Sequence, residues 1–380
     1  MTKRIAILTG GGHISTLNSG IAAIITNAQK HGWQVIGALN GWQGMQEDRF
    51  VNLDLSQPQI EKLTYGGGTV IKSSRTKPML TRVTEHLSKR RIEGVVAMGG
   101  DDTLGAAAKL HEDYDIQIVG WPKTMDNDLS KTYCCLGYAS AVQAAAQCLH
   151  NSFDGAYSHN RIAIVTMFGR DTDWVVVGAG AYGHADVIIP AEKEYALDDI
   201  TMRIEDAYHQ NAGCVVVAVA EGAKLTGLES HVQKEDIDQF GHYKLDPHLL
   251  VVSLGAAIRE FTKKRGKEIR CTLLSLTYQL RNGRPLDIDR RLAMEAGRYC
   301  VDLLAENRGG EMATITLNRD QLEVASAVPL KEAAVTRPVA GTEYFNYETL
   351  CATRDFFDYA YPLLGEMSTK PGYDFSLSPI

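Results

Sequence analysis

The sequence predicts an α/β protein with two Rossmann-like α/β/α lobes and mostly parallel sheets. Short apolar runs rich in valine and isoleucine alternate with longer helical patterns, which is typical of strands joined by crossover helices. Glycine-rich turns follow several of these runs, and glycine is frequent, at 35 of 380 residues. Because parallel sheets bind ligands where their strands end, we expect the chemistry at these turns.

The elements of the first lobe alternate along residues 4–121. Each expected strand is an apolar run, and most end at glycine or proline. These strands cover residues 4–9, 34–39, 94–98 and 116–121, with helices over about 17–31 and 103–111. After residue 137 a second series begins, with strands over 161–167, 186–189, 214–220 and 269–276 and helices near 140–153, 173–182, 197–210, 248–264 and 289–306.

Charge and cysteine usage exclude several classes of protein. The sum of 39 basic and 46 acidic residues is a net charge of −7, which argues against nucleic-acid binding and a basic membrane-surface role. No uncharged run reaches the ~18 residues of a membrane span. The seven cysteines form no CxxC pair, so neither a zinc knuckle nor a disulfide framework is expected. We expect a soluble, cytoplasmic protein.

Gly10, Gly11 and Gly12 follow the first strand and precede a helix, an arrangement that suits a phosphate group. Glycine lets backbone N–H groups approach closely, and a helix N-terminus favours an anion. The dinucleotide pattern GxGxxG fails at Ser15, and no Asp or Glu follows the second strand to hold a ribose, so a dinucleotide dehydrogenase is excluded. The P-loop pattern GxxxxGK[ST] is also absent. A tight strand–helix turn without a ligand explains the glycines equally well.

Two acidic stretches follow other predicted strands. Gly-Gly-Asp-Asp-Thr at 99–103 places two carboxylates at a helix N-terminus, where they can hold Mg²⁺ beside phosphate oxygens. One Asp would be enough for a helix cap, which is the alternative. Pro-Lys-Thr-Met-Asp-Asn-Asp at 122–128 combines a base, a metal-facing acid and a cation, as phosphoryl transfer requires. A solvated polar loop is the alternative there.

These stretches, with four others, resemble 6-phosphofructokinases of the bacterial type, and most closely their pyrophosphate-dependent branch. The other motifs are Gly-Tyr-Ala-Ser-Ala at 137–141, Phe-Gly-Arg at 168–170, Ala-Glu-Gly at 220–222 and Tyr-Gln-Leu-Arg-Asn-Gly at 278–283. The resemblance implies a phosphofructokinase-like fold and phosphoryl transfer from pyrophosphate to the 1-hydroxyl of fructose 6-phosphate, with Mg²⁺. It also implies a glycolytic homo-oligomer, a dimer or tetramer, whose subunits share the sugar-phosphate site.

The resemblance implies a role for each matched residue. Asp126 matches the base that deprotonates the sugar hydroxyl, Asp101 the magnesium-associated aspartate, and Arg170 a catalytic residue between the substrates. The residues expected to bind the donor are Gly11, Arg75 and Thr103. Those expected to bind the sugar phosphate are Thr124, Asp128, Arg161, Phe168, Gly169, Glu221, Tyr278 and Arg281, with Arg161 reaching into a neighbouring subunit's site.

The resemblance also implies how the chain divides between the substrates. Residues 1–137, with about 280–306, are expected to hold the donor and magnesium. Residues 138–279, with about 307–345, are expected to hold the sugar phosphate, and 346–380 form a C-terminal extension similar to that of many pyrophosphate-dependent members.

The choice of donor depends on Asp102 and Lys123, which we also expect to be catalytic. In ATP-using relatives the position of Asp102 is usually glycine, which leaves room for the nucleotide, whereas a carboxylate there repels the α-phosphate. Lys123 replaces a residue that is often glycine, and its ammonium can neutralise a short inorganic donor. The alternative is that Asp102 caps the helix and Lys123 faces solvent.

Three other functions stay open. The first is an ATP-dependent kinase of the same fold. The second is a kinase for another sugar phosphate, because Phe168 replaces the common methionine and Asp173 stands at a usual glycine. The third is a non-catalytic sugar-phosphate sensor, against which the retained Asp101, Asp126 and Asp128 argue.

Overall fold

The computed structural model describes residues 2–228, 232–237 and 243–370, and the chain divides into two compact units. The first unit comprises residues 1–141, 234–244 and 278–338, and the second comprises 142–233, 245–277 and 339–380. The last ten residues of the expected C-terminal extension lie outside the described residues. Among the helices of the described residues, none is long and apolar enough to cross a membrane.

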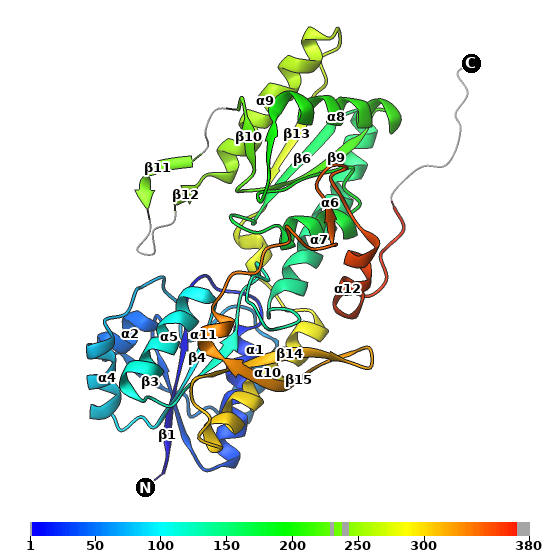
Figure 1. The fold of residues 1–380 in the computed structure, drawn as a ribbon. Helices are drawn as coiled ribbons and strands as arrows, with labels where there is room; N and C mark the ends of the chain where they lie inside the picture. Colours follow the sequence, from blue (N-terminus) through cyan, green and yellow to red (C-terminus); the bar gives the residue numbers. More distant parts are fainter. Residues whose placement is uncertain (1, 229–231, 238–242, 371–380) are drawn as a thin grey trace. The chain divides into compact units, whose positions relative to one another are not determined.

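A seven-stranded sheet forms the centre of the first unit, in the order β15-β14-β5-β4-β1-β2-β3 (Figure 1). Neighbouring strands from β14 to β2 run parallel, while β3 and β15 pair antiparallel at the edges. The register aligns Thr9 with Met98 and Gly99 with Pro122, so β1, β4 and β5 end side by side. The strands are β1 Arg4–Thr9, β2 Gln34–Ala38, β3 Phe50–Asn52, β4 Gly94–Gly99, β5 Ile118–Pro122, β14 Glu311–Asn318 and β15 Gln321–Pro329.

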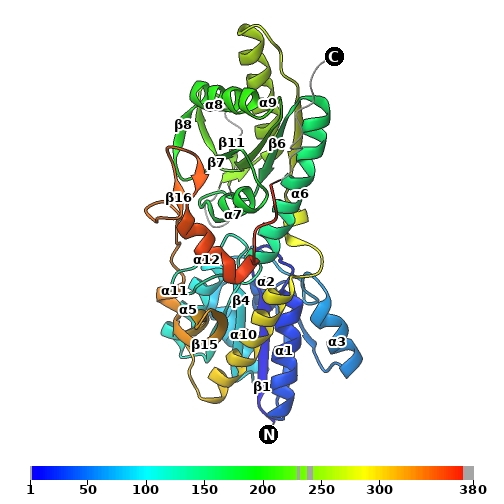
Figure 2. The same ribbon diagram turned by 90° about the vertical axis from the view of Figure 1, so that its right-hand side faces the viewer.

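Helices cover both faces of this sheet. On one face, α1 (Leu17–Lys30) packs between α10 (Asp287–Ala305) and α3 (Gln57–Tyr65), as Figure 2 shows for α1 and α10. The other face carries α2, α4, α5 and α11, which are Trp42–Gln46, Leu80–Lys89, Asp101–Tyr114 and Leu330–Ala333.

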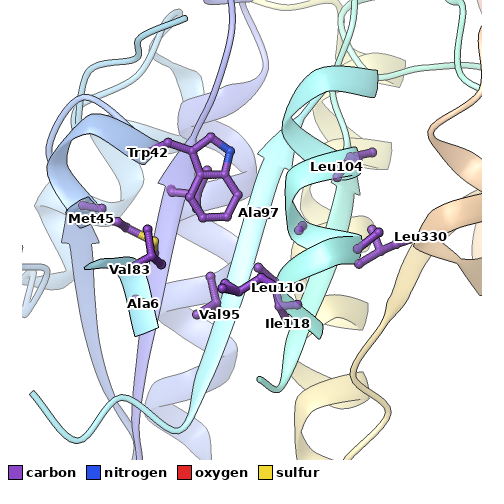
Figure 3. Packing of buried hydrophobic residues seen from close by; sticks show 14 of the residues in the cluster. Ala6, Trp42, Met45, Val83, Val95, Ala97, Leu104, Leu110, Ile118 and Leu330 are labelled. Carbon is purple, nitrogen blue, oxygen red and sulfur yellow. The ribbon is translucent and has the colours of Figure 1, made fainter. Parts of the chain in front are cut away.

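The apolar core beneath the second group of helices holds them to the sheet (Figure 3). Trp42 of α2 and Leu104 of α5 lie over Ala97 of β4, and Leu330 reaches the same layer from α11. All four side chains are at most 2 % exposed. This core keeps the start of α5, and its acidic residues, at the end of β4.

The predicted lobe assignment of residues 307–345 is wrong for β14 and β15. Met312 of β14 pairs with Gly120 of β5, and β15 pairs antiparallel with β14. Met312 and Leu330 are buried in the core of the first unit. The physical reason is that the exposed edge of β5 and the apolar face beside it need covering, and this segment supplies both a strand and a helix.

The second unit contains a four-stranded parallel sheet in the order β13-β6-β9-β7. Helices α8 and α9 cover one side of this sheet, and α7 lies on the other (Figures 1 and 2). The strands are β6 Ile162–Met167, β7 Val187–Ile189, β9 Val215–Ala220 and β13 Cys271–Ser275, and the helices are α6 Tyr138–His159, α7 Trp174–Tyr182, α8 Leu197–Gln210, α9 Pro247–Lys264 and α12 Arg354–Leu364. Short ladders in this unit join β8 (Glu194–Ala196) to β10 (Lys224–Thr226) and β16 (Phe345–Asn346) to β17 (Cys351–Ala352). A further ladder joins β11 (Val232–Ile237) to β12 (Tyr243–Leu245), and most of its residues belong to the first unit.

The predicted class of two α/β/α lobes with mostly parallel sheets is confirmed.

The start of helix α6 depends on a distant residue that local sequence patterns cannot identify. Helix α6 begins at Tyr138 because buried Asp289 of α10 accepts hydrogen bonds from the N–H groups of Gly137 (3.0 Å) and Ser140 (3.1 Å). Burial raises the pKa of Asp289. The cap of α6 therefore comes from a residue 152 positions later in the chain.

Candidate active site

The glycine turn after β1 lies against two cationic side chains. Lys123 Nζ donates to the Gly12 carbonyl at 2.8 Å, and a Cβ on Gly11 would stand 3.0 Å from the same nitrogen. Gly11 also has a φ of +75°, and a Cβ on Gly12 would overlap the Arg281 guanidinium. A side chain at either glycine would therefore displace a cation.

Two backbone N–H groups of this turn, those of Gly10 and Gly11, donate to other carbonyls of the protein, which differs from the expected phosphate cradle. Gly10 donates to the Met98 carbonyl and Gly11 to the Ser74 carbonyl, both at 2.9 Å. A phosphate at this turn would therefore meet the cations beside Gly11 and Gly12 rather than these two amides.

Lys123 is buried, with 4 % of its surface exposed, and Arg281 is 7 % exposed. Burial, followed by repulsion from Arg281 and Arg75, lowers the pKa of Lys123 to about 7, although Asp126 and Asp128 oppose the change. A bound anion stabilises the charged form of a buried lysine more than that of a solvated lysine, because the buried ammonium has lost its hydration. The alternative of a solvent-facing Lys123 is therefore wrong.

Helix α5 begins at the two acidic residues after β4. Its N-cap is Gly100, and Asp101 and Asp102 occupy the first turn, so neither carboxylate is the capping residue. Both line a cavity of about 390 Å³, together with Lys77 and Lys109. Carboxylates that face a cavity lined by lysines are placed to meet a ligand or a cation.

Thr103 faces the ends of β1 and β4 instead of this cavity. It is 5 % exposed, and a Cβ on Gly10 or Gly99 would overlap its side chain. The two glycines leave the room that this hydroxyl occupies.

The turn after β5 brings a hydroxyl and two carboxylates together. Thr124 Oγ1 accepts a hydrogen bond from the Asp126 N–H at 3.0 Å and lies 3.4 Å from the Asp126 carboxylate. Burial, with repulsion from Asp126 and Asp101, raises the pKa of Asp128 to about 7. Within the described part of the chain, the Asp128 Oδ1 atom is buried without a hydrogen-bond partner. Asp128 is therefore repelled by the charges of Asp126 and Asp101, and a bound cation would reduce this repulsion.

Arg337 fixes the course of this turn, and no sequence pattern selected it. Its Nη2 donates to the Asn127 carbonyl at 3.1 Å, and its backbone N–H donates to the Asp128 carbonyl at 2.6 Å. Nη1 donates to the Thr132 carbonyl at 2.9 Å. Asn127 has a φ of 55°, so the turn adopts a left-handed conformation that these bonds hold in place. Arg337 lies about two hundred residues from the turn in sequence, and no local spacing connects them.

Two predicted sugar-phosphate residues, Tyr278 and Arg281, come from one short helix beside the glycine turn, η1 (Tyr278–Arg281). Tyr278 is 64 % exposed and stacks on His13, with ring centroids 5.8 Å apart. A hydrogen bond of 2.8 Å joins His13 Nε2 to Asn282 Oδ1. Sequence reasoning missed His13 as a site residue because its partners follow more than 260 positions later.

The other predicted residues belong to the second unit. Phe168, Gly169 and Arg170 follow β6, and Glu221 follows the neighbouring β9, at ends where Met167 aligns with Ala220. The Gly222 N–H donates to the Gly169 carbonyl at 3.0 Å, so the two loops are joined. Arg161 precedes β6 and lies at the opposite end of that strand. Arg161 is thus separated from the other four residues within its own chain.

Asp173 does not face an acceptor. It is fully buried, and its carboxylate accepts hydrogen bonds from the N–H groups of Ala191 (2.6 Å) and Glu192 (3.3 Å) and from the Tyr347 hydroxyl (3.0 Å). The departure from glycine at this position therefore gives no support to a different sugar phosphate.

The residues at the ends of β4 and β5 fit a magnesium ion. Mg²⁺ prefers oxygen ligands and is usually held by one or two carboxylates together with substrate phosphates. The described residues contain no group of three or more His, Cys, Asp or Glu placed to hold a metal by themselves. The unpartnered Asp128 oxygen and the repulsion between Asp128 and Asp101 are consistent with a cation that arrives with its phosphate ligands.

Comparison with known proteins identifies the family. The model of the family Phosphofructokinase matches residues 4–304. The chain is 32% identical over 319 residues to a pyrophosphate--fructose 6-phosphate 1-phosphotransferase of Streptomyces coelicolor, covering 82% of this chain and 90% of that protein. It is 30% identical over 343 residues to ATP-dependent 6-phosphofructokinase 3 of the same organism, covering 89% of this chain and 97% of that protein.

A solved structure supports the same fold. The crystal structure of a pyrophosphate-dependent phosphofructokinase from Marinobacter aquaeolei matches with a TM-score of 0.82 at 22% identity, and the match covers 98% of this chain and 94% of that one. The predicted resemblance is confirmed by the family model and by the relatives. The chain belongs to the phosphofructokinase family.

Proposed function

We propose that the protein transfers a phosphoryl group from pyrophosphate to the 1-hydroxyl of fructose 6-phosphate and gives fructose 1,6-bisphosphate. The observation that carries the choice of donor is the pair Lys123 and Asp102. Lys123 is a buried cation beside the glycine turn, and Asp102 places a carboxylate in the cavity at the start of α5. Relatives that use either donor share the fold and about 30% of the sequence, so the donor rests on these residues.

In the proposed reaction, Asp126 accepts the proton of the 1-hydroxyl as the hydroxyl oxygen attacks the terminal phosphorus in line. The bond from that phosphorus to the bridging oxygen breaks, and orthophosphate leaves. Thr124 orients the Asp126 carboxylate, since the two are neighbours in one turn. Lys123 and Arg281 neutralise charge on the transferring group, with Arg75 and Arg170 as further contributors.

Asp101 and Asp128 would hold the magnesium ion that the family's chemistry implies. When bound, Mg²⁺ supplies positive charge that neutralises phosphate oxygens. The role of Asp128 in this proposal is to offer its unpartnered oxygen while it gives up the proton that its raised pKa favours near neutrality.

A turnover assay that crosses pyrophosphate and ATP with several sugar phosphates tests the function. We expect turnover with pyrophosphate and fructose 6-phosphate to exceed every other pair. Faster turnover with ATP would identify the ATP-dependent kinase. Faster turnover with another acceptor would instead assign a different sugar phosphate, and Phe168 would be the first residue to examine.

Replacing both Asp102 and Lys123 with glycine is expected to raise the ratio of ATP to pyrophosphate turnover by about tenfold or more. The Asp102→Gly change removes a carboxylate that would repel the α-phosphate, and Lys123→Gly removes the charge that suits a short donor. Because Lys123 is buried, the thermal midpoint of the double variant is measured as a control. A folded variant with an unchanged ratio would show that other residues select the donor.

Replacing Arg337 with methionine is expected to lower kcat by about 10–100-fold, because the side chain no longer donates to the carbonyls of Asn127, Thr132 and Tyr133. Arg337→Lys should recover part of the loss, since one ammonium cannot reach all three carbonyls. Steady-state kinetics measures both variants. Arg354→Met, at a side chain that is 89% exposed, is the matched control and should leave kcat unchanged. An unchanged kcat in Arg337→Met would remove Arg337 from the positioning of the turn.

We also propose a homo-oligomer whose subunits share the sugar-phosphate site. Arg161 lies at the end of β6 away from the Phe168–Arg170 loop, so its proposed role requires the site of another subunit. Strand β13 is an edge of its sheet, and Leu273 on it and Val252 on α9 are 37 % and 47 % exposed. Sedimentation velocity measures the assembly directly, and a monomer at assay concentration would exclude a shared site.

A further inference from the structure

In the second unit the carboxylates of buried Asp173 and half-buried Glu192 each accept the backbone N–H of the other residue, and Glu192 also binds the segment after residue 338. The Glu192 carboxylate accepts the Asp173 N–H at 2.8 Å, while the Asp173 carboxylate accepts the Glu192 N–H at 3.3 Å. Glu192 also accepts the N–H of Val339 at 2.8 Å and that of Ala340. A reciprocal pair of this kind ties the start of α7 to the segment that follows β7 and to the chain after residue 338.

Tyr347 places one hydroxyl between these two carboxylates. Its oxygen lies 3.0 Å from Asp173 Oδ2 and 3.3 Å from Glu192 Oε2, and its own carbonyl accepts the Tyr195 hydroxyl at 2.8 Å. Burial, with the charges of Asp173 and Glu192, raises the pKa of Tyr347, so the phenol keeps its proton. A single donor thus separates two acceptors that would otherwise repel each other.

The same cluster fixes one end of the loop 168–172. The other end is held by Glu221 and Gly222, whose N–H groups donate to the carbonyls of Met167 (2.8 Å) and Gly169 (3.0 Å). Between these anchors lie Phe168 and Arg170, two of the residues assigned to the substrates. The loop conformation therefore depends on Asp173, which follows it directly.

We propose that Asp173, Glu192 and Tyr347 form a positioning cluster through which residues 339–347 set the conformation of the loop 168–172 and thereby the affinity for the sugar phosphate. This inference rests on the proposed function, since it assigns the loop to the acceptor. It gives the chain after residue 338 a role in substrate binding.

The cluster makes this affinity sensitive to pH. The titratable groups that face Asp173 are Glu192, Tyr347 and Tyr195. Burial raises the pKa of Asp173 to about 6; Glu192 adds to the increase, while the Ala191 N–H and the Tyr347 hydroxyl oppose it. Protonated Asp173 accepts hydrogen bonds more weakly, so the loop loosens and the KM for fructose 6-phosphate rises as pH falls through about 6.

Two substitutions move this pH dependence in opposite directions. Tyr347→Phe removes the shared donor, so Asp173 should protonate at higher pH and the inflection in KM should move upward by about half a unit or more. Glu192→Gln removes the neighbouring charge, so the inflection should move downward. At pH 7 we expect Tyr347→Phe to raise this KM about fivefold, with kcat and the KM for pyrophosphate within about twofold of the wild type.

Tyr344→Phe is the matched control. Within the described residues its hydroxyl makes no hydrogen bond, and its ring stacks on Tyr359 at 5.1 Å. The ionisation of fructose 6-phosphate itself is common to all variants and cancels in the comparison. Equal KM profiles in the wild type, Tyr347→Phe and Glu192→Gln would overturn the proposal, as would a loss confined to kcat.

Hydrogen–deuterium exchange over residues 168–172 separates this proposal from the proposed function. Tyr347→Phe should speed exchange there about fivefold or more relative to Tyr344→Phe, whichever substrates the enzyme uses. Unchanged exchange would overturn the cluster, whereas absence of wild-type turnover with fructose 6-phosphate would count against the proposed function alone.

Discussion

Replacing Asp126 with serine is expected to lower kcat with pyrophosphate and fructose 6-phosphate by about 10²–10⁴-fold, the range for loss of a positioned base. The serine hydroxyl cannot accept the proton of the 1-hydroxyl at neutral pH. Sugar-phosphate affinity should change less than about threefold, because binding depends on cations elsewhere. Steady-state kinetics gives kcat, and calorimetry gives the affinity for fructose 6-phosphate.

Asp113→Ser is the control for this substitution. Asp113 is exposed near the end of α5, on the same helix that begins with Asp101. Turnover of this control should match the wild type. If Asp126→Ser retains near-normal turnover, Asp126 is not the base, and Asp128 would be tested next by the same two measurements.

Replacing Lys123 with methionine is expected to lower kcat/KM for pyrophosphate by about 10²–10³-fold, because a buried charge that meets the donor is lost. The wild-type profile should show a limb that falls as pH rises through about 7, where Lys123 in the free enzyme loses its proton. The variant has no proton to lose there, so this limb should vanish. Measuring kcat/KM from pH 6 to 9 tests both statements.

Lys62→Met on α3 serves as the control, since Lys62 is exposed. Its profile should overlay the wild type. The ionisation of pyrophosphate affects all three proteins equally, so only a limb that persists in Lys123→Met would contradict the assignment to Lys123.

Much of the fold could be predicted because its signals are local. Strands β6 and β9 are apolar runs, followed by Phe168–Gly169 and by Glu221 respectively, and the glycine turn after β1 can be recognised without knowledge of its partners. The misplaced segment shows the limit of this reasoning. No local pattern in β14 and β15 indicates which sheet these strands join. They belong to the first sheet because β14 pairs with the free edge of β5.

The residues of the candidate site likewise fall into those that local motifs identify and those that only folding brings together. The acidic motifs at 99–103 and 122–128 could be found because their functional groups are neighbours in the chain and follow strands. Arg337 and Tyr347 could not, because each acts on a partner more than 170 positions away. Asp173 shows the opposite case. Its departure from the family pattern suggested a contact with the substrate, whereas its carboxylate accepts hydrogen bonds from groups of the protein itself.

The sequence by itself determined the fold class, the family and the residue types that carry phosphoryl transfer, because these depend on periodicity and on groups close together in the chain. Only the tertiary structure decided that Lys123 is buried against the glycine turn, that Gly100 rather than an aspartate caps α5, and that Arg337 holds the turn of Asp126. Burial and repulsion act between residues brought together by folding, so the charge states of these groups are properties of the folded chain.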